Sequence, residues 1–167
     1  NLLVFLPALT GHLLTPESFS TLLVLFFSLS FVASGMYLIN DLLDIDNDKK
    51  HPTKKNRLIA RGSLSPKNAK IISLLLIIMG LLGSFAVSFY GGILIFVYMV
   101  LVGVYSLYIK RVPFFEAFFL TLVYLLRIYI GLLVINESAS QWLMIFSFFF
   151  FFFLVLVKRH AELLLHL

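Results

Sequence analysis

Long apolar segments recur along this chain and constrain its fold more than any other feature. A helix needs about 20 mainly apolar residues to cross the roughly 30 Å hydrocarbon layer of a membrane. With 61% hydrophobic and 13% charged residues, the chain also has more apolar surface than one soluble core of this size could bury. Windows of suitable length occur at Ser20–Ile39, Ile71–Tyr90, Gly92–Ile109, Phe114–Ile135 and Trp142–Val157. The pattern predicts an all-α, polytopic transmembrane helical bundle.

The first residues, Asn1–Leu14, are apolar but short. They have no initiator Met and no basic flank of the kind that precedes a signal peptide, so we expect them to be the remainder of a first span. This brings the expected number of spans to six. Because the sequence stops soon after Val157, we expect residues 1–167 to be a single transmembrane domain that is incomplete at both ends. Cysteine is absent, which excludes disulfides and thiolate metal ligands.

Basic residues are distributed unevenly among the predicted loops. Twelve of the thirteen Lys and Arg residues fall in three segments, 49–70, 110–111 and 158–159, and the intervening loops have none. Short basic loops stay on the cytoplasmic side of a membrane. We therefore expect an integral protein of the inner (plasma) membrane, with its active site facing the cytoplasm. The net charge of +5 then reflects topology, and we expect no nucleic-acid partner, because that would require a soluble basic surface.

An acidic row follows the second span, in the string NDLLDIDNDKK. If the helix continues past Ile39, a rotation of about 100° per residue places Asp41, Asp44 and Asp48 within roughly 60°, with Asn40 beside them. Carboxylates that face one another repel unless a cation lies between them. Oxygen ligands without His or Cys favour Mg²⁺. We therefore predict that Asp41, Asp44 and Asp48 bind the metal, and that Asp41 and Asp44 are catalytic.

A basic loop comes directly after this row. Pro52 is expected to end the helix, because it lacks an amide hydrogen and its ring clashes with the preceding turn. Lys54 and Arg57 then follow, and their side chains can bind phosphate oxygens. The sequence thus predicts a metal-assisted pyrophosphate site at the membrane surface, with Asn40, Lys54 and Arg57 in contact with the substrate. A solvated loop that only sets orientation is the alternative, and it suffices for Lys55.

Arg127 is the one basic residue inside a predicted span, about 20 Å from the cytoplasmic end by helical rise. A buried cation is costly and usually faces a polar cavity or a partner, so we predict a substrate-binding role. Snorkelling toward the outer surface is the alternative. Glu116, near the inner end of the same helix, is expected at the membrane interface.

The acidic row resembles the first aspartate-rich motif of the UbiA prenyltransferase superfamily, N-D-x-x-D-x-x-x-D over residues 40–48. The order of features is also similar, with YSLYIK at Tyr105–Lys110 after the fourth span and Arg127 followed by Gly131 in the next. The resemblance covers nearly all of the chain. It implies an intramembrane bundle of about nine spans, each of roughly 20 residues, and a cytoplasmic Mg²⁺–diphosphate site.

Two further strings resemble the decaprenyl-phosphate phosphoribosyltransferase branch: HPTK at His51–Lys54 and KRHAEL at Lys158–Leu163. Other superfamily members carry a second aspartate-rich motif where this chain has KRHAEL. Lys and Arg there remove a second metal site and can bind an anion such as a lipid phosphate. We therefore expect Lys158, Arg159 and Glu162 to bind substrate, although Glu162 can also pair with Lys158 along the helix.

This resemblance implies a Mg²⁺-dependent membrane enzyme that transfers 5-phosphoribose from phosphoribosyl pyrophosphate to a polyprenyl phosphate, a step in cell-wall biosynthesis. The alternative is a UbiA-type prenyltransferase that moves a prenyl group from its diphosphate to an aromatic acceptor. A cation channel or scaffold is a third hypothesis, which the uniformly apolar spans disfavour. Membrane lipids are expected partners, and the sequence does not indicate whether the protein forms a homo-oligomer.

Overall fold

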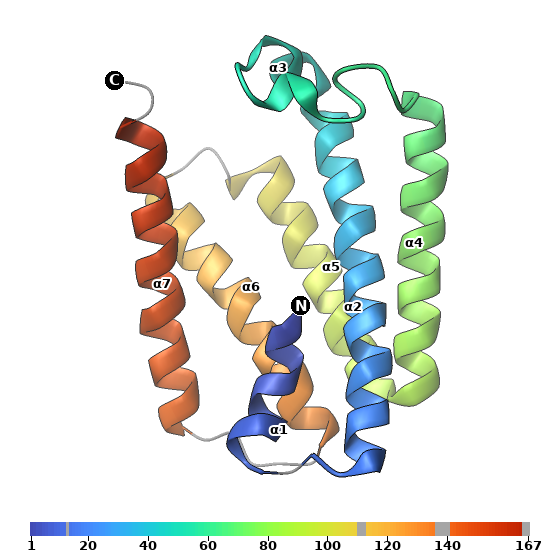
Figure 1. Ribbon diagram of the computed structural model, residues 1–167, viewed down its shortest axis with the longest axis vertical. Helices are drawn as coiled ribbons and strands as arrows, with labels where there is room; N and C mark the ends of the chain where they lie inside the picture. Colours follow the sequence, from blue (N-terminus) through green and yellow to red (C-terminus); the bar gives the residue numbers. More distant parts are fainter. Residues whose placement is uncertain (13, 110–112, 136–140, 165–167) are drawn as a thin grey trace.

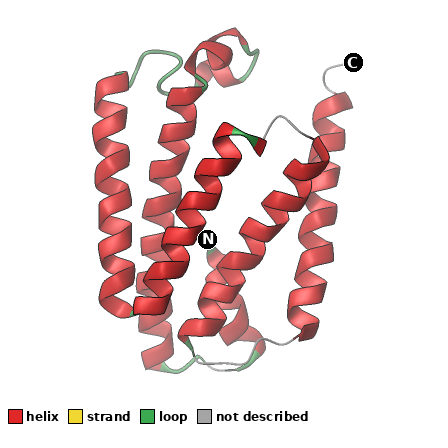
Figure 2. Ribbon diagram, turned by 180° about the vertical axis from the view of Figure 1, so that it is seen from behind, coloured by secondary structure: helices red, strands yellow, loops and turns green. Residues whose placement is uncertain are grey.

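Every regular element that the structure describes is a helix (Figures 1 and 2). The computed structural model describes residues 1–12, 14–109, 113–135 and 141–164, and leaves aside the side chains at 113, 114 and 162–164. Five helices each contain a stretch long and apolar enough to cross a membrane. They are α2 (Pro16–Leu43), α4 (Pro66–Val87), α5 (Phe89–Leu107), α6 (Pro113–Val134) and α7 (Gln141–Leu164). The predicted polytopic helical bundle is therefore confirmed.

The N-terminal segment is helical but shorter than a span. It forms a 3-10 turn, η1 (Leu2–Phe5), and a short helix, α1 (Leu6–Thr10). Both elements contact α6 and occupy one half of the bundle (Figure 1). The approach is close, because a Cβ at Gly131 of α6 would collide with the carbonyl oxygen of Val4. Within the described residues, five helices rather than the expected six thus meet the length of a span.

Hydroxyl side chains fix where several of the long helices begin. Thr15 caps α2, since its Oγ1 accepts a hydrogen bond from the Ser18 amide at 3.1 Å while Ser18 Oγ accepts one from the Thr15 amide at 2.9 Å. Ser65 caps α4 and Ser88 caps α5 in a similar way. Such caps satisfy amide groups that the first helical turn leaves without partners. The boundary between α4 and α5 consequently lies at Ser88, earlier than the Tyr90 expected from hydropathy.

Helices α2 and α4 pack side by side along most of their length (Figure 1). A Cβ at Gly80 of α4 would lie 2.5 Å from the carbonyl oxygen of Ser28, and one at Gly35 of α2 would lie 2.8 Å from that of Ser73. Lipid provides little hydrophobic drive for helix association, so small residues that allow close backbone contact stabilise such pairs. This contact helps to position the end of α2, which carries the acidic row.

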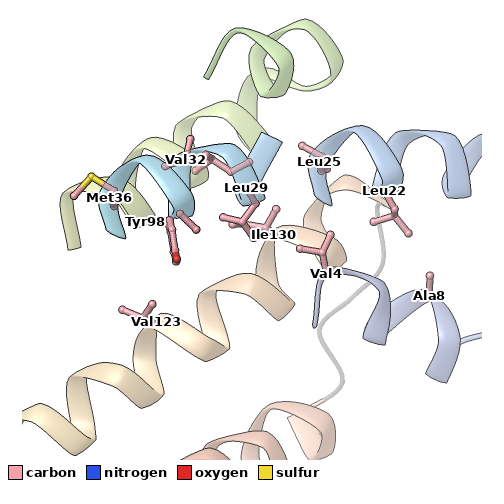
Figure 3. Close-up of a cluster of buried hydrophobic side chains, with 12 residues drawn as sticks. Val4, Ala8, Leu22, Leu25, Leu29, Val32, Met36, Tyr98, Val123 and Ile130 are labelled. Carbon is pink, nitrogen blue, oxygen red and sulfur yellow. The ribbon is translucent and has the colours of Figure 1, made fainter. Parts of the chain in front are cut away.

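The buried core joins α2 to α5, α6 and the N-terminal segment (Figure 3). Its residues include Val4, Ala8, Leu22, Leu25, Leu29, Val32, Met36, Tyr98, Val123 and Ile130. Successive long helices run in opposite directions, so α2, α5 and α7 all end at the end of the bundle that carries α3 (Figure 1). Basic segments 49–70 and 158–159 therefore share one end of the molecule, as expected. Lys110 and Arg111 lie outside the described residues.

Candidate active site

The acidic row lies at a break between two helices. Helix α2 ends at Leu43, Asp44 has φ −101° and ψ 5°, and a separate short helix, α3 (Ile45–Lys50), follows. The prediction of one continuous helix through Asp48 was therefore wrong at Asp44, where these dihedral angles leave the α-helical region. The predicted end before Pro52 is confirmed, since α3 stops at Lys50 and His51 is extended, as expected for a residue before proline.

Arg57 joins the two ends of this row. Its Nη1 donates to Asp41 Oδ1 at 2.8 Å and to Asp48 Oδ2 at 2.9 Å. The 3-10 turn η2 (Lys54–Asn56) leads the chain into Arg57, which thereby comes back to the end of α2. Asp48 has only 5% of its side chain exposed, and Arg57 has 36%. Asp41 and Asp48 thus converge as predicted, but the cation between them is a guanidinium group from the following loop.

The chemistry of this cluster fits a divalent cation. No group of three or more His, Cys, Asp or Glu side chains is arranged to hold a metal ion within the described part of the chain. However, Mg²⁺ commonly takes only one or two carboxylates from a protein and completes its octahedron with water and phosphate oxygens. Asp41 and Asp48, whose oxygens reach the same guanidinium nitrogen, are sufficient for that role. Asp44 lies between them in sequence, and the Lys54 side chain is exposed on η2.

A cavity lies among α2, α5 and α6, and Arg127 lines it with only 9% of the residue exposed. Arg127 Nη2 donates to Tyr98 Oη at 2.8 Å, and its guanidinium carbon lies 5.3 Å and 5.2 Å from the ring centroids of Tyr98 and Tyr124. Tyr124 in turn stacks on Phe151 of α7. These contacts hold Arg127 inside the bundle, so it faces a cavity rather than snorkelling to a membrane surface.

Two buried polar atoms beside this cavity have no hydrogen-bond partner among the described residues: Asn40 Oδ1 and Arg127 Nε. Both residues line the cavity, Asn40 from α2 and Arg127 from α6. A buried donor or acceptor without a partner is uncommon and costs free energy. The cavity therefore offers one acceptor and one charged donor to a bound molecule.

A second charged cluster connects α5, α6 and α7. Tyr105 Oη donates to Glu116 Oε1 at 2.8 Å, and Arg159 Nη1 forms an ion pair with Glu116 Oε2. Tyr105 also lines the cavity, so this cluster adjoins it. Glu116 was assigned only to the membrane interface from the sequence, and its 43-residue separation from Arg159 gave no local signal of their contact. It is the main site residue that sequence reasoning missed.

The chain resembles known proteins over most of its length. The UbiA prenyltransferase family matches residues 4–161 of the chain. The chain belongs to this family. It is 30% identical over 147 residues to decaprenyl-phosphate phosphoribosyltransferase of Mycobacterium tuberculosis, and the matched region covers 88% of the chain and 49% of that protein. It is 31% identical over 165 residues to "Uncharacterized protein y4nM" of Sinorhizobium fredii, and the matched region covers 97% of the chain and 32% of that protein.

A different activity is named for another relative within the UbiA prenyltransferase family. Protoheme IX farnesyltransferase of Klebsiella pneumoniae is 36% identical over 111 residues, covering 64% of the chain and 36% of that protein. The chain thus spans between 32% and 49% of the length of these relatives. Family membership confirms the resemblance seen in the sequence and indicates a transferase in a membrane. Enzymes of this family generally depend on a divalent metal.

The structure of this UbiA family chain thus brings six of the predicted site residues, together with Glu116, into three neighbouring groups. The groups are Asp41, Asp48 and Arg57 at the end of α2, Asn40 and Arg127 at the cavity, and Arg159 with Glu116 on α7 and α6. Lys158 is exposed near the end of α7. The side chain of Glu162 lies outside the described residues, so its predicted role stays a prediction.

Proposed function

We propose that this protein transfers 5-phosphoribose from phosphoribosyl pyrophosphate to a polyprenyl phosphate, in a Mg²⁺-dependent reaction at the cytoplasmic face of the membrane. The observation that carries the proposal is the position of Arg159. Arg159 lies on α7, where other family members carry a second acidic motif. It pairs with Glu116, which accepts a hydrogen bond from Tyr105, and Tyr105 lines the cavity. The planar guanidinium group of arginine can donate two hydrogen bonds to a phosphate group, which is the reacting group of a polyprenyl phosphate acceptor.

The α2 end of the site would bind the donor. Asp41 and Asp48, with Asp44 between them in sequence, would hold a Mg²⁺ ion, which supplies charge neutralisation for a departing diphosphate. Arg57 already lies against both carboxylates, and Lys54 is three residues earlier in the chain. Their side chains would donate to the diphosphate oxygens that the carboxylates repel. These residues therefore bind and orient the leaving group.

The α7 end of the site would bind the acceptor. Lys158 and Arg159 would hold the lipid phosphate, while its apolar tail lies along the helices or in the surrounding lipid. An oxygen of that phosphate forms the new bond to the anomeric carbon of ribose as the bond to diphosphate breaks. A phosphate ester is anionic near neutral pH, so the reaction needs no strong base. The groups that the reaction requires are therefore carboxylates to hold the metal ion and cations to hold the two phosphorylated substrates.

The test uses the purified full-length protein with Mg²⁺ and a polyprenyl phosphate. One reaction contains labelled phosphoribosyl pyrophosphate, and the other contains a labelled prenyl diphosphate together with an aromatic acceptor. We expect label to enter the lipid only from the ribosyl donor, and excess EDTA to stop the transfer. Label transfer only from the prenyl diphosphate to the aromatic acceptor would refute the proposal.

That second outcome would establish prenyl transfer, the other candidate function. It is favoured by the similarity to protoheme IX farnesyltransferase and by the apolar part of the cavity wall, which includes Met36, Val102 and Val123. Both candidates share the same diphosphate chemistry at Asp41 and Asp48. They differ in what the remainder of the site must accommodate, a phosphorylated sugar or an isoprenoid chain.

A further inference from the structure

We propose that the cavity among α2, α5 and α6 is a subsite for the monophosphate end of a phosphorylated sugar, with Arg127 as the residue that binds it. The inference rests on the proposed function and extends it, because it assigns a second anionic group of the donor to a place inside the bundle. It also excludes an isoprenoid chain as the occupant of this cavity.

The first reason is the uncompensated charge of Arg127. No Asp or Glu forms an ion pair with it among the residues that the structure describes, although it is 9% exposed. One neutral hydroxyl, from Tyr98, and the faces of two tyrosine rings surround its guanidinium. These contacts stabilise a cation without neutralising it, and a buried charge in a membrane protein normally has a charged or strongly polar partner. An anionic ligand would provide that partner.

The second reason is the pair of unpartnered atoms, which are of opposite kinds. Arg127 Nε can only donate a hydrogen bond, whereas Asn40 Oδ1 can only accept one. A hydrocarbon chain in the cavity would leave both without a partner and away from water, which is unfavourable. A sugar phosphate satisfies both, because its phosphate oxygens accept from Nε and its hydroxyls donate to Oδ1.

The third reason is the position of the cavity next to the carboxylate pair. Asn40 lines the cavity, and the adjacent residue, Asp41, binds Arg57 together with Asp48. A donor with two anionic ends can therefore place its diphosphate at the carboxylate end and its monophosphate near Arg127. A prenyl diphosphate has only one anionic end. The arrangement of charges accordingly matches a phosphorylated pentose donor.

The test measures binding rather than turnover, with the full-length protein in lipid nanodiscs. Ribose 5-phosphate is the probe, because it carries the monophosphate and the hydroxyls but no diphosphate, and inorganic pyrophosphate with Mg²⁺ is the comparison. In Arg127→Gln we expect the affinity for ribose 5-phosphate to fall about 10- to 100-fold, from the loss of charge-assisted hydrogen bonds. The affinity for pyrophosphate should change less than about twofold, because the carboxylates pair with Arg57 and no contact joins them to Arg127 among the described residues.

Lys67→Gln is the matched control, since it removes one positive charge from an exposed position at the start of α4 and should leave both affinities unchanged. If Arg127→Gln does not fold, Asn40→Leu provides the second test, with an expected loss of about 5- to 10-fold for ribose 5-phosphate. Failure of the wild-type protein to bind ribose 5-phosphate, or equal affinity in a folded Arg127→Gln protein, would overturn the subsite.

The two proposals fail in different ways. If ribose 5-phosphate binds through Arg127 but the enzyme transfers only prenyl groups, the proposed function is wrong and the subsite stands. If the enzyme transfers phosphoribose and Arg127→Gln leaves the KM for phosphoribosyl pyrophosphate unchanged, the function stands and the subsite is wrong.

Discussion

Replacing Arg57 with Gln should lower the free energy of unfolding in the absence of divalent cations. It should also increase the stabilisation that the protein gains when a divalent cation binds. The change removes the positive charge that lies 2.8 Å from Asp41 and 2.9 Å from Asp48. Breaking a buried ion pair costs about 3–5 kcal/mol, whereas exposed pairs contribute about 0.2–1 kcal/mol. Asp48 is nearly buried but Arg57 is 36% exposed, so we expect an intermediate loss. The free energy of unfolding should fall by about 1–2 kcal/mol in EDTA.

Mg²⁺ should then stabilise the Arg57→Gln variant more than it stabilises the wild type. In the wild-type protein, a divalent ion at Asp41 and Asp48 must compete with the guanidinium group for the same carboxylate oxygens. The variant lacks this competitor, so it should bind the ion more tightly. Binding at a free concentration 100 times Kd stabilises a folded protein by about 2.7 kcal/mol, which is enough to offset the loss seen in EDTA.

The assay is the unfolding of purified full-length protein in detergent, with EDTA or with saturating Mg²⁺. Lys55→Gln is the matched control, because Lys55 is an exposed cation of the same loop and its loss should change stability by less than about 0.5 kcal/mol. An equal loss of stability in EDTA and in Mg²⁺ would refute the idea that Arg57 and a divalent ion share these carboxylates. Unchanged stability in EDTA would show that the ion pairs contribute nothing.

Three further predictions concern the packing and the candidate site. Gly80→Ala places a Cβ 2.5 Å from a backbone carbonyl oxygen of α2 and should cost about 1–3 kcal/mol in an unfolding assay. In contrast, a Cβ at Gly103 would lie 3.5 Å from the flexible methyl group of Met36, so Gly103→Ala should cost less than about 0.5 kcal/mol. Similar costs for both substitutions would contradict the close α2–α4 contact. Glu116→Ala releases Arg159 and should raise the KM for polyprenyl phosphate about 10-fold, so an unchanged KM would separate this ion pair from acceptor binding. Asp44→Ala should abolish transfer while membrane insertion stays intact, and full activity would remove Asp44 from the catalytic set.

The long helices could be predicted from the sequence because their signal is local. A span must be apolar over about 20 consecutive residues, and the windows found in the sequence correspond to α2 and α4–α7. Hydropathy did not locate every boundary, because a helix can be stopped and restarted by a single side chain. Ser88 shows this, since its hydroxyl caps α5 inside a stretch that otherwise appears continuously apolar.

The contacts of the site could be predicted only in part, because some of them depend on how distant segments pack. Helical spacing correctly brought Asp41 and Asp48 together, although the helix is interrupted at Asp44. The position of Arg57 between them depends on how the following loop returns to the end of α2, which no periodicity encodes. The ion pair between Glu116 and Arg159 likewise depends on how α6 packs against α7.

The three arginines of the site differ in what a bound anion must replace. Arg57 and Arg159 are paired with carboxylates, so a phosphate that binds either of them exchanges one charge-assisted contact for another. Within the part of the chain that the structure describes, Arg127 contacts a hydroxyl and two aromatic faces and no carboxylate, so a phosphate there adds a contact without displacing a carboxylate. The net gain in binding free energy should therefore be largest at Arg127. We expect Arg127→Gln to raise the Kd for phosphoribosyl pyrophosphate more than Arg57→Gln does, and the reverse order, measured by titration in Mg²⁺, would contradict this reasoning.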